Sequence, residues 1–221
     1  MSARFRTLPF LSLLCVSACL PEATLETASQ KASYGIGLNM GRSLVEVQDH
    51  VDMPALMKGF TDALAEGEPA ISQEEIDAAM TEFTEMVQAE AAETALSEGA
   101  EYLAENAARE GVTVTESGLQ YEVLREGDGA TPQSGQRVTV HYRGTMPDES
   151  EFDSSYGRGE PSMFGVDNVV DGFSEALKLM KVGGHLRVVL PGDLAYGPEG
   201  RAPLIGPNQV LVFEIELLGV E

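Results

Sequence analysis

The sequence predicts an α+β fold in which an antiparallel sheet is half-wrapped around one short helix. An all-α region and a long linking helix come first. The chain up to about residue 115 is rich in Ala, Glu and Met, and its apolar residues recur at helical spacing. From residue 116 the chain is rich in Gly, Pro and Val, and apolar residues recur at every second position, as in half-buried strands.

Composition and charge exclude several classes of function. The 221 residues carry a formal net charge of -22, which argues against a nucleic-acid partner because phosphate binding needs clustered Lys and Arg. His50, His141 and His185 are far apart and lack the spacing of metal ligands. No nucleophile elbow or phosphate loop occurs in the sequence. We therefore expect neither a cofactor nor a metal.

Residues 1–19 are predicted to be a lipoprotein signal peptide. Arg4 and Arg6 form a positive segment, and the apolar stretch from Leu8 to Leu14 is far shorter than the roughly 20 residues that span a bilayer. The tetrad Val16-Ser17-Ala18-Cys19 resembles a bacterial lipobox. This resemblance implies cleavage before Cys19 and acylation of its thiol and its new amino terminus. The alternative is ordinary signal cleavage that leaves a spare cysteine.

The lipid on Cys19 would place the protein at the outer membrane, facing the periplasm. Several acyl chains anchor stably where one is marginal, since each buried methylene contributes about 0.8 kcal/mol. Leu20 follows the cysteine, where an Asp would resemble an inner-membrane retention signal. Cys15 would leave with the signal, so the mature chain would hold one cysteine and no internal disulfide.

Residues 20–71 are predicted to be a helical dimerisation domain. One helix is expected over residues 29–47, with an apolar stripe at a spacing of four, and a second begins after Asp52, which we expect to act as its N-cap, with Pro54 in its first turn. Their apolar stripes need a partner, and a second copy of the chain could provide one. The alternative is a monomeric bundle. The stripe residues are Ala32, Ile36, Met40 and Leu44, then Leu56, Phe60 and Leu64.

Residues 72–115 are predicted to form a long connecting helix. Ser72 opens a capping box with Glu75, and the helical pattern runs to about Glu110. Gly99 allows a bend, because a glycine in a helix costs about 1 kcal/mol relative to Ala. The residues from Glu90 onward are mostly Ala and acidic, which predicts a solvated strut. The earlier residues Ile76, Met80, Phe83 and Val87 are expected to face a core.

Residues 116–221 are expected to form the sheet domain. Period-two patterns predict strands at 137–143 and 211–217, and further strands are expected at 119–124 and 185–190. One short helix fits residues 171–180, with Asp171 as its N-cap. Its residues Phe173, Ala176, Leu177 and Met180 should point inward.

Five segments of this half resemble, in the family's order, the motifs of the FKBP-type peptidyl-prolyl isomerase domain. One such motif is weak, but five in order over residues 118–221 are specific. The segments are Val140-His141-Tyr142-Arg143-Gly144, Phe152-Asp153-Ser154-Ser155, Val169-Val170-Asp171-Gly172-Phe173, Leu194-Ala195-Tyr196-Gly197 and Leu211-Val212-Phe213-Glu214.

The first half resembles the dimerisation region of the macrophage infectivity potentiator branch of that family. The similarity lies in Ser33-Tyr34-Gly35-Ile36-Gly37 and in Lys58-Gly59-Phe60, and it continues through Ser117-Gly118-Leu119-Gln120-Tyr121 where the halves meet. The long helix is several residues shorter than is usual in that branch. The resemblance implies a homodimer through the N-terminal helices.

The resemblance also implies the residues of a proline-binding pocket. Tyr196 would hold a substrate carbonyl through its hydroxyl, and Asp153 would orient polar neighbours such as Tyr142. The family often has a Trp where this chain has Phe173 and an aromatic residue where it has Ser162, so the pocket should be apolar but wider on one side. The implied catalytic residues are Tyr142, Phe152, Asp153, Phe164, Val169, Val170, Phe173, Tyr196, Ile205 and Phe213.

The expected function is peptidyl-prolyl cis/trans isomerisation that assists the folding of periplasmic or outer-membrane proteins. Its partners would be unfolded or proline-containing clients. A second hypothesis is a dimeric chaperone or binding module in which the isomerase pocket is secondary, and a third is a degenerate domain kept as scaffold. Retention of Tyr142, Asp153, Tyr196 and Phe213 argues against the third.

Overall fold

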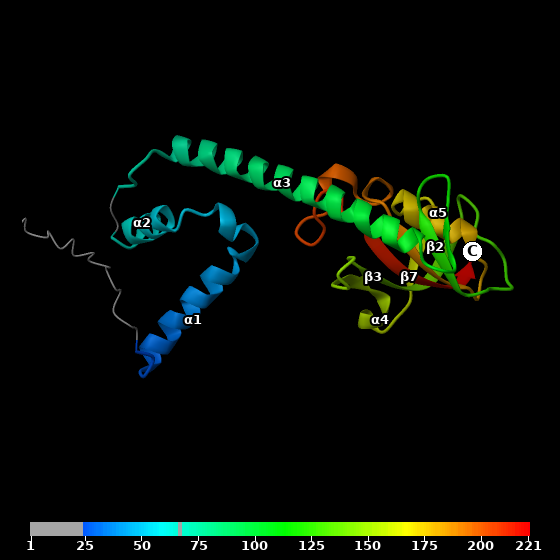
Figure 1. Cartoon of the computed structure of the whole chain (residues 1–221). Helices are drawn as coiled ribbons and strands as arrows, with labels where there is room; N and C mark the ends of the chain where they lie inside the picture. The colour runs from blue at the N-terminus through cyan, green and yellow to red at the C-terminus, as the bar shows by residue number, and fades with distance from the viewer. Residues whose placement is uncertain (1–23, 66–67) are drawn as a thin grey trace, which may run out of the picture. The chain divides into compact units, whose positions relative to one another are not determined.

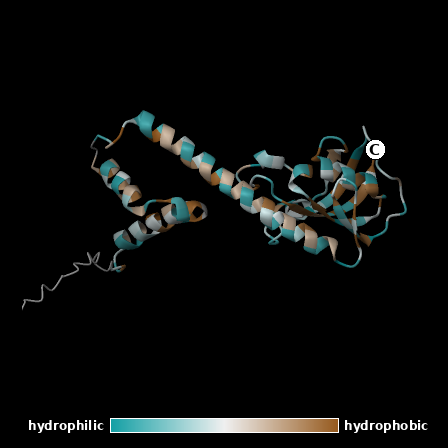
Figure 2. Cartoon of the chain, turned by 45° about the horizontal axis from the view of Figure 1, so that its top comes forward, coloured by the Kyte–Doolittle hydropathy of each residue, from teal (hydrophilic) through white to brown (hydrophobic). Residues whose placement is uncertain are grey.

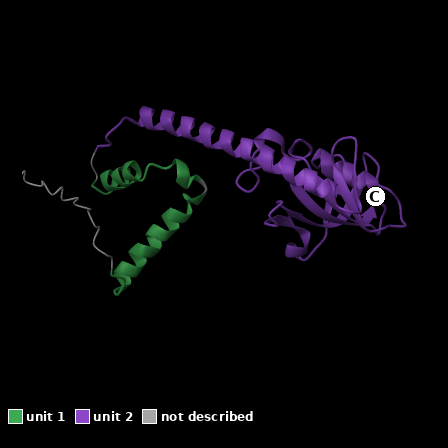
Figure 3. Cartoon of the chain, in the orientation of Figure 1, with its two compact units in different colours: residues 1–67 green, residues 68–221 purple. Residues whose placement is uncertain are grey.

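The computed structural model describes residues 24–65 and 68–221. The predicted signal peptide and Cys19 lie outside these residues. The chain divides into two compact units, residues 1–67 and residues 68–221 (Figure 3). Hydrophobic and hydrophilic residues alternate along the helices (Figure 2), and none of the helices in the described ranges combines the length and the hydropathy needed to cross a bilayer.

The described part of the first unit is helical (Figure 1). It contains α1 (Ala28–Arg42), a 3-10 helix η1 (Val45–His50) and α2 (Met53–Leu64). Asp52 caps α2 as predicted, because its carboxylate accepts a hydrogen bond from the Ala55 amide at 2.8 Å. Helix α1 ends at Arg42, earlier than predicted. The Ser43 hydroxyl donates to the Met40 carbonyl at 2.8 Å, which gives that carbonyl a partner other than the helix.

Within residues 24–65, the apolar stripes of the first unit are only partly covered. Neither α1 nor α2 contains a buried residue. Ile36 is 61% exposed, Met53 56% and Leu64 70%. Large apolar side chains on successive helices are rarely left in water, so this surface is suited to an interaction.

Helix α3 (Gln73–Ala107) is continuous over 35 residues and passes through Gly99 without a break. The predicted capping box is confirmed, since the Ser72 hydroxyl accepts from the Glu75 amide and the Glu75 carboxylate accepts from the Ser72 amide. The helix ends three residues before Glu110, and the chain turns at Gly111, whose φ of 87° suits glycine.

The C-terminal half of α3 packs on the sheet, so the prediction of a solvated strut was wrong. Ala95, Gly99 and Asn106 are buried, and Tyr102 and Leu103 pack against a cluster of three valines, Val189, Val210 and Val212. The early half, which we expected to face a core, is less covered, and Met80 is 57% exposed. Small residues let the helix approach the sheet closely, and such residues leave little hydrophobic periodicity in the sequence.

The second unit is built on a seven-stranded antiparallel sheet in the order β1-β2-β6-β7-β3-β4, with β5 pairing β3. Strands β2, β3, β6 and β7 confirm the predicted strands, whereas β1, β4 and β5 were not predicted. The strands are β1 (Val112–Val114), β2 (Gln120–Arg125), β3 (Arg137–Thr145), β4 (Glu151–Ser154), β5 (Ser162–Gly165), β6 (His185–Leu190) and β7 (Leu211–Val220).

Two short α-helices and two 3-10 helices join the strands. They are α4 (Ser155–Arg158), α5 (Asp171–Leu179), η2 (Gly192–Leu194) and η3 (Gly197–Glu199). Asp171 is the first residue of α5 and not its N-cap, which is Val170 and makes no side-chain cap. At that position the Asp171 carboxylate still lies at the positive end of the helix dipole.

The main core lies between one face of the sheet and α5. Alternate residues of β3 and β7 are buried, as the period-two pattern predicted, and Phe173, Ala176, Leu177 and Met180 of the α5 segment are buried against them. The fold class is therefore confirmed: an antiparallel sheet with one short helix, preceded by helices and a long helix.

We predict that Gly99 is required for the packing of α3 on the sheet. A Cβ at Gly99 would lie 2.9 Å from Val210 Cγ2, and β-branched Val210 has little freedom to move away. The variant Gly99→Leu should unfold at a lower urea concentration than the parent. Overpacking lowers the free energy of unfolding by about 1–3 kcal/mol. Replacing a glycine inside a helix raises it by roughly 1 kcal/mol, so we expect a net loss of stability.

The neighbouring variant Ala100→Leu is the matched control, because Ala100 is exposed on the same helix. It should change the free energy of unfolding by less than about 0.5 kcal/mol. A Gly99→Leu protein as stable as the Ala100→Leu protein would contradict the packing described here.

Candidate functional site

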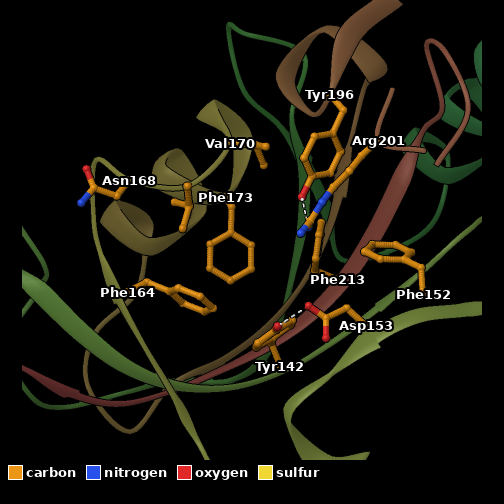
Figure 4. Close-up of a pocket in the computed structure, with 11 residues that line it drawn as sticks. Tyr142, Phe152, Asp153, Phe164, Asn168, Val170, Phe173, Tyr196, Arg201 and Phe213 are labelled. Carbon is orange, nitrogen blue, oxygen red and sulfur yellow. Dashed lines mark hydrogen bonds between the residues drawn. The ribbon is translucent and has the colours of Figure 1, made fainter. Parts of the chain in front are cut away.

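A pocket of about 490 Å³ opens at one end of the sheet's inner face, beside the N-terminal end of α5 (Figure 4). Its walls come from β3, β4, β5, α5 and β7 and from the segments that precede α5 and β7. The lining residues are Tyr142, Phe152, Asp153, Phe164, Asn168, Val169, Val170, Phe173, Tyr196, Arg201 and Phe213.

Aromatic rings form the floor and walls of this pocket. Phe173 and Phe213 meet edge to face with their centroids 5.2 Å apart, and Phe152 meets Phe213 in the same way at 5.6 Å. Tyr142 lies 6.0 Å from Phe173 and 5.6 Å from Phe164. Edge-to-face pairs of this kind add roughly 0.5–1.5 kcal/mol each beyond area burial, so the rings hold one another in place.

Gly144 makes room for two of these rings. It lies on β3 directly opposite Phe213 on β7. A Cβ at Gly144 would come within 2.6 Å of the Phe152 ring and 2.9 Å of the Phe213 ring. The absence of a side chain at this point of the strand therefore leaves room for both rings, which meet edge to face.

Asp153 is held in a hydrogen-bonded group at the edge of the pocket. The Tyr142 hydroxyl and the Arg158 guanidinium both donate to its carboxylate. Arg158 also donates to the Tyr142 oxygen at 2.9 Å and to the Ser162 hydroxyl at 3.0 Å. Partial burial opposes ionisation of Asp153, but these donors together lower its pKa below the ordinary value of 3.8, so it is a carboxylate at neutral pH.

The pKa of Tyr142 is shifted upward, opposite to that of Asp153. Burial raises the pKa of its hydroxyl, and the hydrogen bond to the Asp153 carboxylate raises that pKa further. The hydroxyl therefore stays protonated at neutral pH, with its hydrogen directed to Asp153. The oriented pair presents a fixed polar corner in an otherwise aromatic pocket.

The two serines after Asp153 fix the backbone that carries it. The Ser154 hydroxyl caps the short helix α4 by accepting from the Gly157 amide at 3.3 Å. The fully buried Ser155 hydroxyl accepts from the Tyr142 amide at 2.8 Å. This second bond ties the start of α4 to Tyr142 on β3, which is also the residue whose hydroxyl binds Asp153.

Tyr196 stands on the opposite side of the pocket from Asp153, together with Arg201 (Figure 4). The Arg201 guanidinium donates to the Tyr196 oxygen at 3.2 Å and lies 5.7 Å from the centre of its ring. Among the described residues, no acceptor receives the hydroxyl's own hydrogen. Tyr196 therefore has a hydrogen available to donate toward a bound ligand.

All the pocket residues that the resemblance implied line this pocket except Ile205. Ile205 is buried in the core, and its side chain lines a neighbouring depression together with Phe152 and Asp153. Asn168 and Arg201, which line the pocket, were not predicted, and Arg158, which orders its polar corner, was also missed. Arg201 lies five positions after Tyr196, and no motif in the sequence marks it as a pocket residue.

The pocket can bind a compact apolar group, and the Tyr196 hydroxyl can donate a hydrogen bond to a polar group next to it. Its one lining carboxylate is already paired, and Arg201, its one lining cation, bonds Tyr196. Binding and desolvation are thus the chemistry that this arrangement supports best.

Two family models match the chain. The family described as "Domain amino terminal to FKBP-type peptidyl-prolyl isomerase" matches residues 29–123. The family described as "FKBP-type peptidyl-prolyl cis-trans isomerase" matches residues 129–218, which include the whole pocket.

Similar proteins agree with these matches. The FKBP-type 22 kDa peptidyl-prolyl cis-trans isomerase of Escherichia coli is 43% identical over 89% of this chain and 98% of its own length. The outer membrane protein MIP of Legionella longbeachae is 33% identical over 96% of this chain and 94% of its own length. The crystal structure of FkpA from Escherichia coli, 35% identical, covers 90% of this chain and 99% of its own with a TM-score of 0.65. The chain belongs to the FKBP-type peptidyl-prolyl cis-trans isomerases.

Proposed function

We propose that the aromatic pocket binds the proline of a polypeptide client and catalyses rotation about the peptide bond before it. One observation carries this assignment: most of the lining residues are aromatic or aliphatic, while one hydroxyl, that of Tyr196, keeps a hydrogen to donate. The clients we propose are periplasmic or outer-membrane proteins that fold around proline bonds.

The physics of the reaction suits such a pocket. Rotation about a peptide bond has a barrier of about 18–20 kcal/mol because resonance is lost, and an X-Pro bond isomerises over tens to hundreds of seconds. The planar amide is more polar than the twisted one. A site whose walls are mostly apolar therefore destabilises the planar ground state more than the twisted transition state, and this difference lowers the barrier. No bond to the protein has to form.

Each polar side chain has a role in this proposal. The Tyr196 hydroxyl donates to a carbonyl of the client and fixes the chain on one side of the proline, so that rotation is confined to one bond. Asp153 holds Tyr142 in place and is itself neutralised by Arg158. The paired carboxylate therefore does not compete for the client's amide groups.

We predict that Tyr196→Phe lowers kcat/KM for isomerisation by about two- to tenfold. The change removes one hydroxyl and keeps the ring, and a neutral hydrogen bond contributes about 0.5–1.5 kcal/mol. Asp153→Leu should lose more, because it leaves the Tyr142 and Arg158 donors unpaired. The measurement is a peptide isomerisation assay on a soluble form that begins at residue 20, with melting temperatures compared first. Normal folding together with parental rates in both variants would show that the site is elsewhere.

We also propose that the first unit forms a homodimer through α1 and α2. The support is the set of large apolar side chains on these helices that the unit itself leaves exposed, and the match to the family model of the amino-terminal domain. Met53 and Met57 are adaptable apolar residues of the kind found at such interfaces.

Light scattering at micromolar concentration tests this assembly. A form that begins at residue 20 should be a dimer, and a form that begins at residue 68, which keeps α3 with the sheet, should be a monomer. Ile36→Asp should dissociate the longer form, because a carboxylate would be buried at the interface without a partner. A monomeric parent, or a dimer that survives both changes, would contradict the proposal.

Finally, we propose that the protein is held at the outer membrane by lipid on Cys19. The support is the lipobox-like sequence from Val16 to Cys19 and the similarity to a relative named as an outer membrane protein. Cys19→Ser should move the protein from the membrane fraction to the soluble periplasm, because the acyl chains would be lost. Membrane fractionation that is unchanged in this variant would refute the anchor.

A further inference from the structure

The surface beside the aromatic pocket continues toward α3. A depression of about 330 Å³ shares Phe152, Asp153 and Arg201 with the pocket and reaches Leu204. Leu204 is 65% exposed, and a further cavity of about 350 Å³ is lined by the same side chain. The proline pocket, the depression and this further cavity therefore follow one another along one path, linked by shared residues.

The further cavity lies between α3 and two loops of the sheet domain, and we call it the α3 subsite. Ala95, Glu98 and Gly99 line it from the helix, Met146 and Asp148 from the turn between β3 and β4, and Val210 from the segment before β7. Val210 is buried and touches the helix where Gly99 has no side chain. Packed elements thus form the walls on the helix and β7 sides.

The chemistry of the α3 subsite combines an apolar interior with a negative rim. Leu204, Met146 and Val210 supply apolar surface, and no Lys or Arg is among the residues that line it. Hydrogen bonds from the Ser150 hydroxyl and amide lower the pKa of Asp148, so this side chain is ionised at neutral pH. Glu98 is exposed on α3, and none of the ion pairs in the described residues involves it or Asp148.

We propose that the α3 subsite binds a lysine or arginine side chain of the same client whose proline occupies the aromatic pocket. Such side chains lay their apolar stems along apolar surface and keep the charged end in water beside carboxylates. An extended client chain advances at most about 3.3–3.6 Å per residue, so the subsite should read a position at a fixed distance from the proline. The inference rests on the proposed function of the pocket and adds a substrate preference to it.

The experiment uses unstructured peptides with one proline and a single lysine, their only charged side chain, placed at successive positions on either side of the proline. Isomerisation is followed by NMR exchange, and the reference peptide has glutamine in place of the lysine. At one position or a few adjacent positions on one side, lysine should raise kcat/KM about two- to fivefold, the effect expected of one exposed ion pair. The gain should appear in KM, because the subsite binds ground state and transition state alike.

Two variants separate the subsite from the general attraction that a chain of net charge -22 exerts on any basic peptide. Glu98→Lys should abolish the lysine preference and create a preference for glutamate at the same position. Glu93→Lys makes the same charge change on an exposed residue of the same helix that lines none of these cavities, and it should keep the preference for lysine.

Each other outcome overturns the inference. A reference peptide that turns over normally with no lysine effect at any position would refute the subsite and leave the proposed function standing. If lysine raised kcat/KM equally at all positions, and if both variants reduced this gain alike, the gain would come from net charge alone and the subsite would be refuted. Failure to isomerise any peptide would refute the proposed function, and the subsite with it.

Discussion

Strands β3 and β7 pair in antiparallel register along the middle of the sheet, and that register decides which side chains reach the pocket. Tyr142 lies opposite Ile215 and Gly144 opposite Phe213, so the four share the inner face. A slip of one residue would turn Phe213 to the outer face, where α3 packs. The position of Gly144 matters for the same reason: the space it leaves is where the Phe152 and Phe213 rings meet.

The second constraint is electrostatic. A carboxylate beside an apolar pocket is costly unless it is paired, and Asp153 is paired twice, with Tyr142 and with Arg158. The ring of Tyr142 belongs to the core while its hydroxyl belongs to this polar group. Tyr142 therefore joins the two, so that a change in core packing also moves Asp153. A ligand in the pocket therefore meets mainly apolar side chains and the free hydroxyl of Tyr196, although Asp153 and Arg201 also line the pocket and Arg158 lies beside it.

Large side chains with regular spacing made much of this structure predictable from the sequence. The alternation in β3 and β7 fixed the inner face, and Phe173 and Leu177 were correctly placed inside. The packing of α3 was missed because Tyr102 and Leu103 are the only large residues that make it, and the buried Ala95 and Gly99 add no large apolar side chain to the helical pattern. Arg158 and Arg201 were missed for another reason: nothing local distinguishes a surface arginine from one that the fold brings to a tyrosine.

The packing of α3 changes how the second unit is understood. At the start of β7 and in the segment before it, Val210 and Val212 face the helix while Leu211 and Phe213 face the main core. Asn106 of α3 accepts from Arg187 at 2.9 Å and donates to Gln120 at 2.8 Å, so the helix end is also bonded to β6 and β2. A protein cut at residue 116 would expose three valines and leave these polar groups without partners. The helix is therefore part of the sheet domain's structure, and it packs on β7, the strand that also carries Phe213 of the pocket.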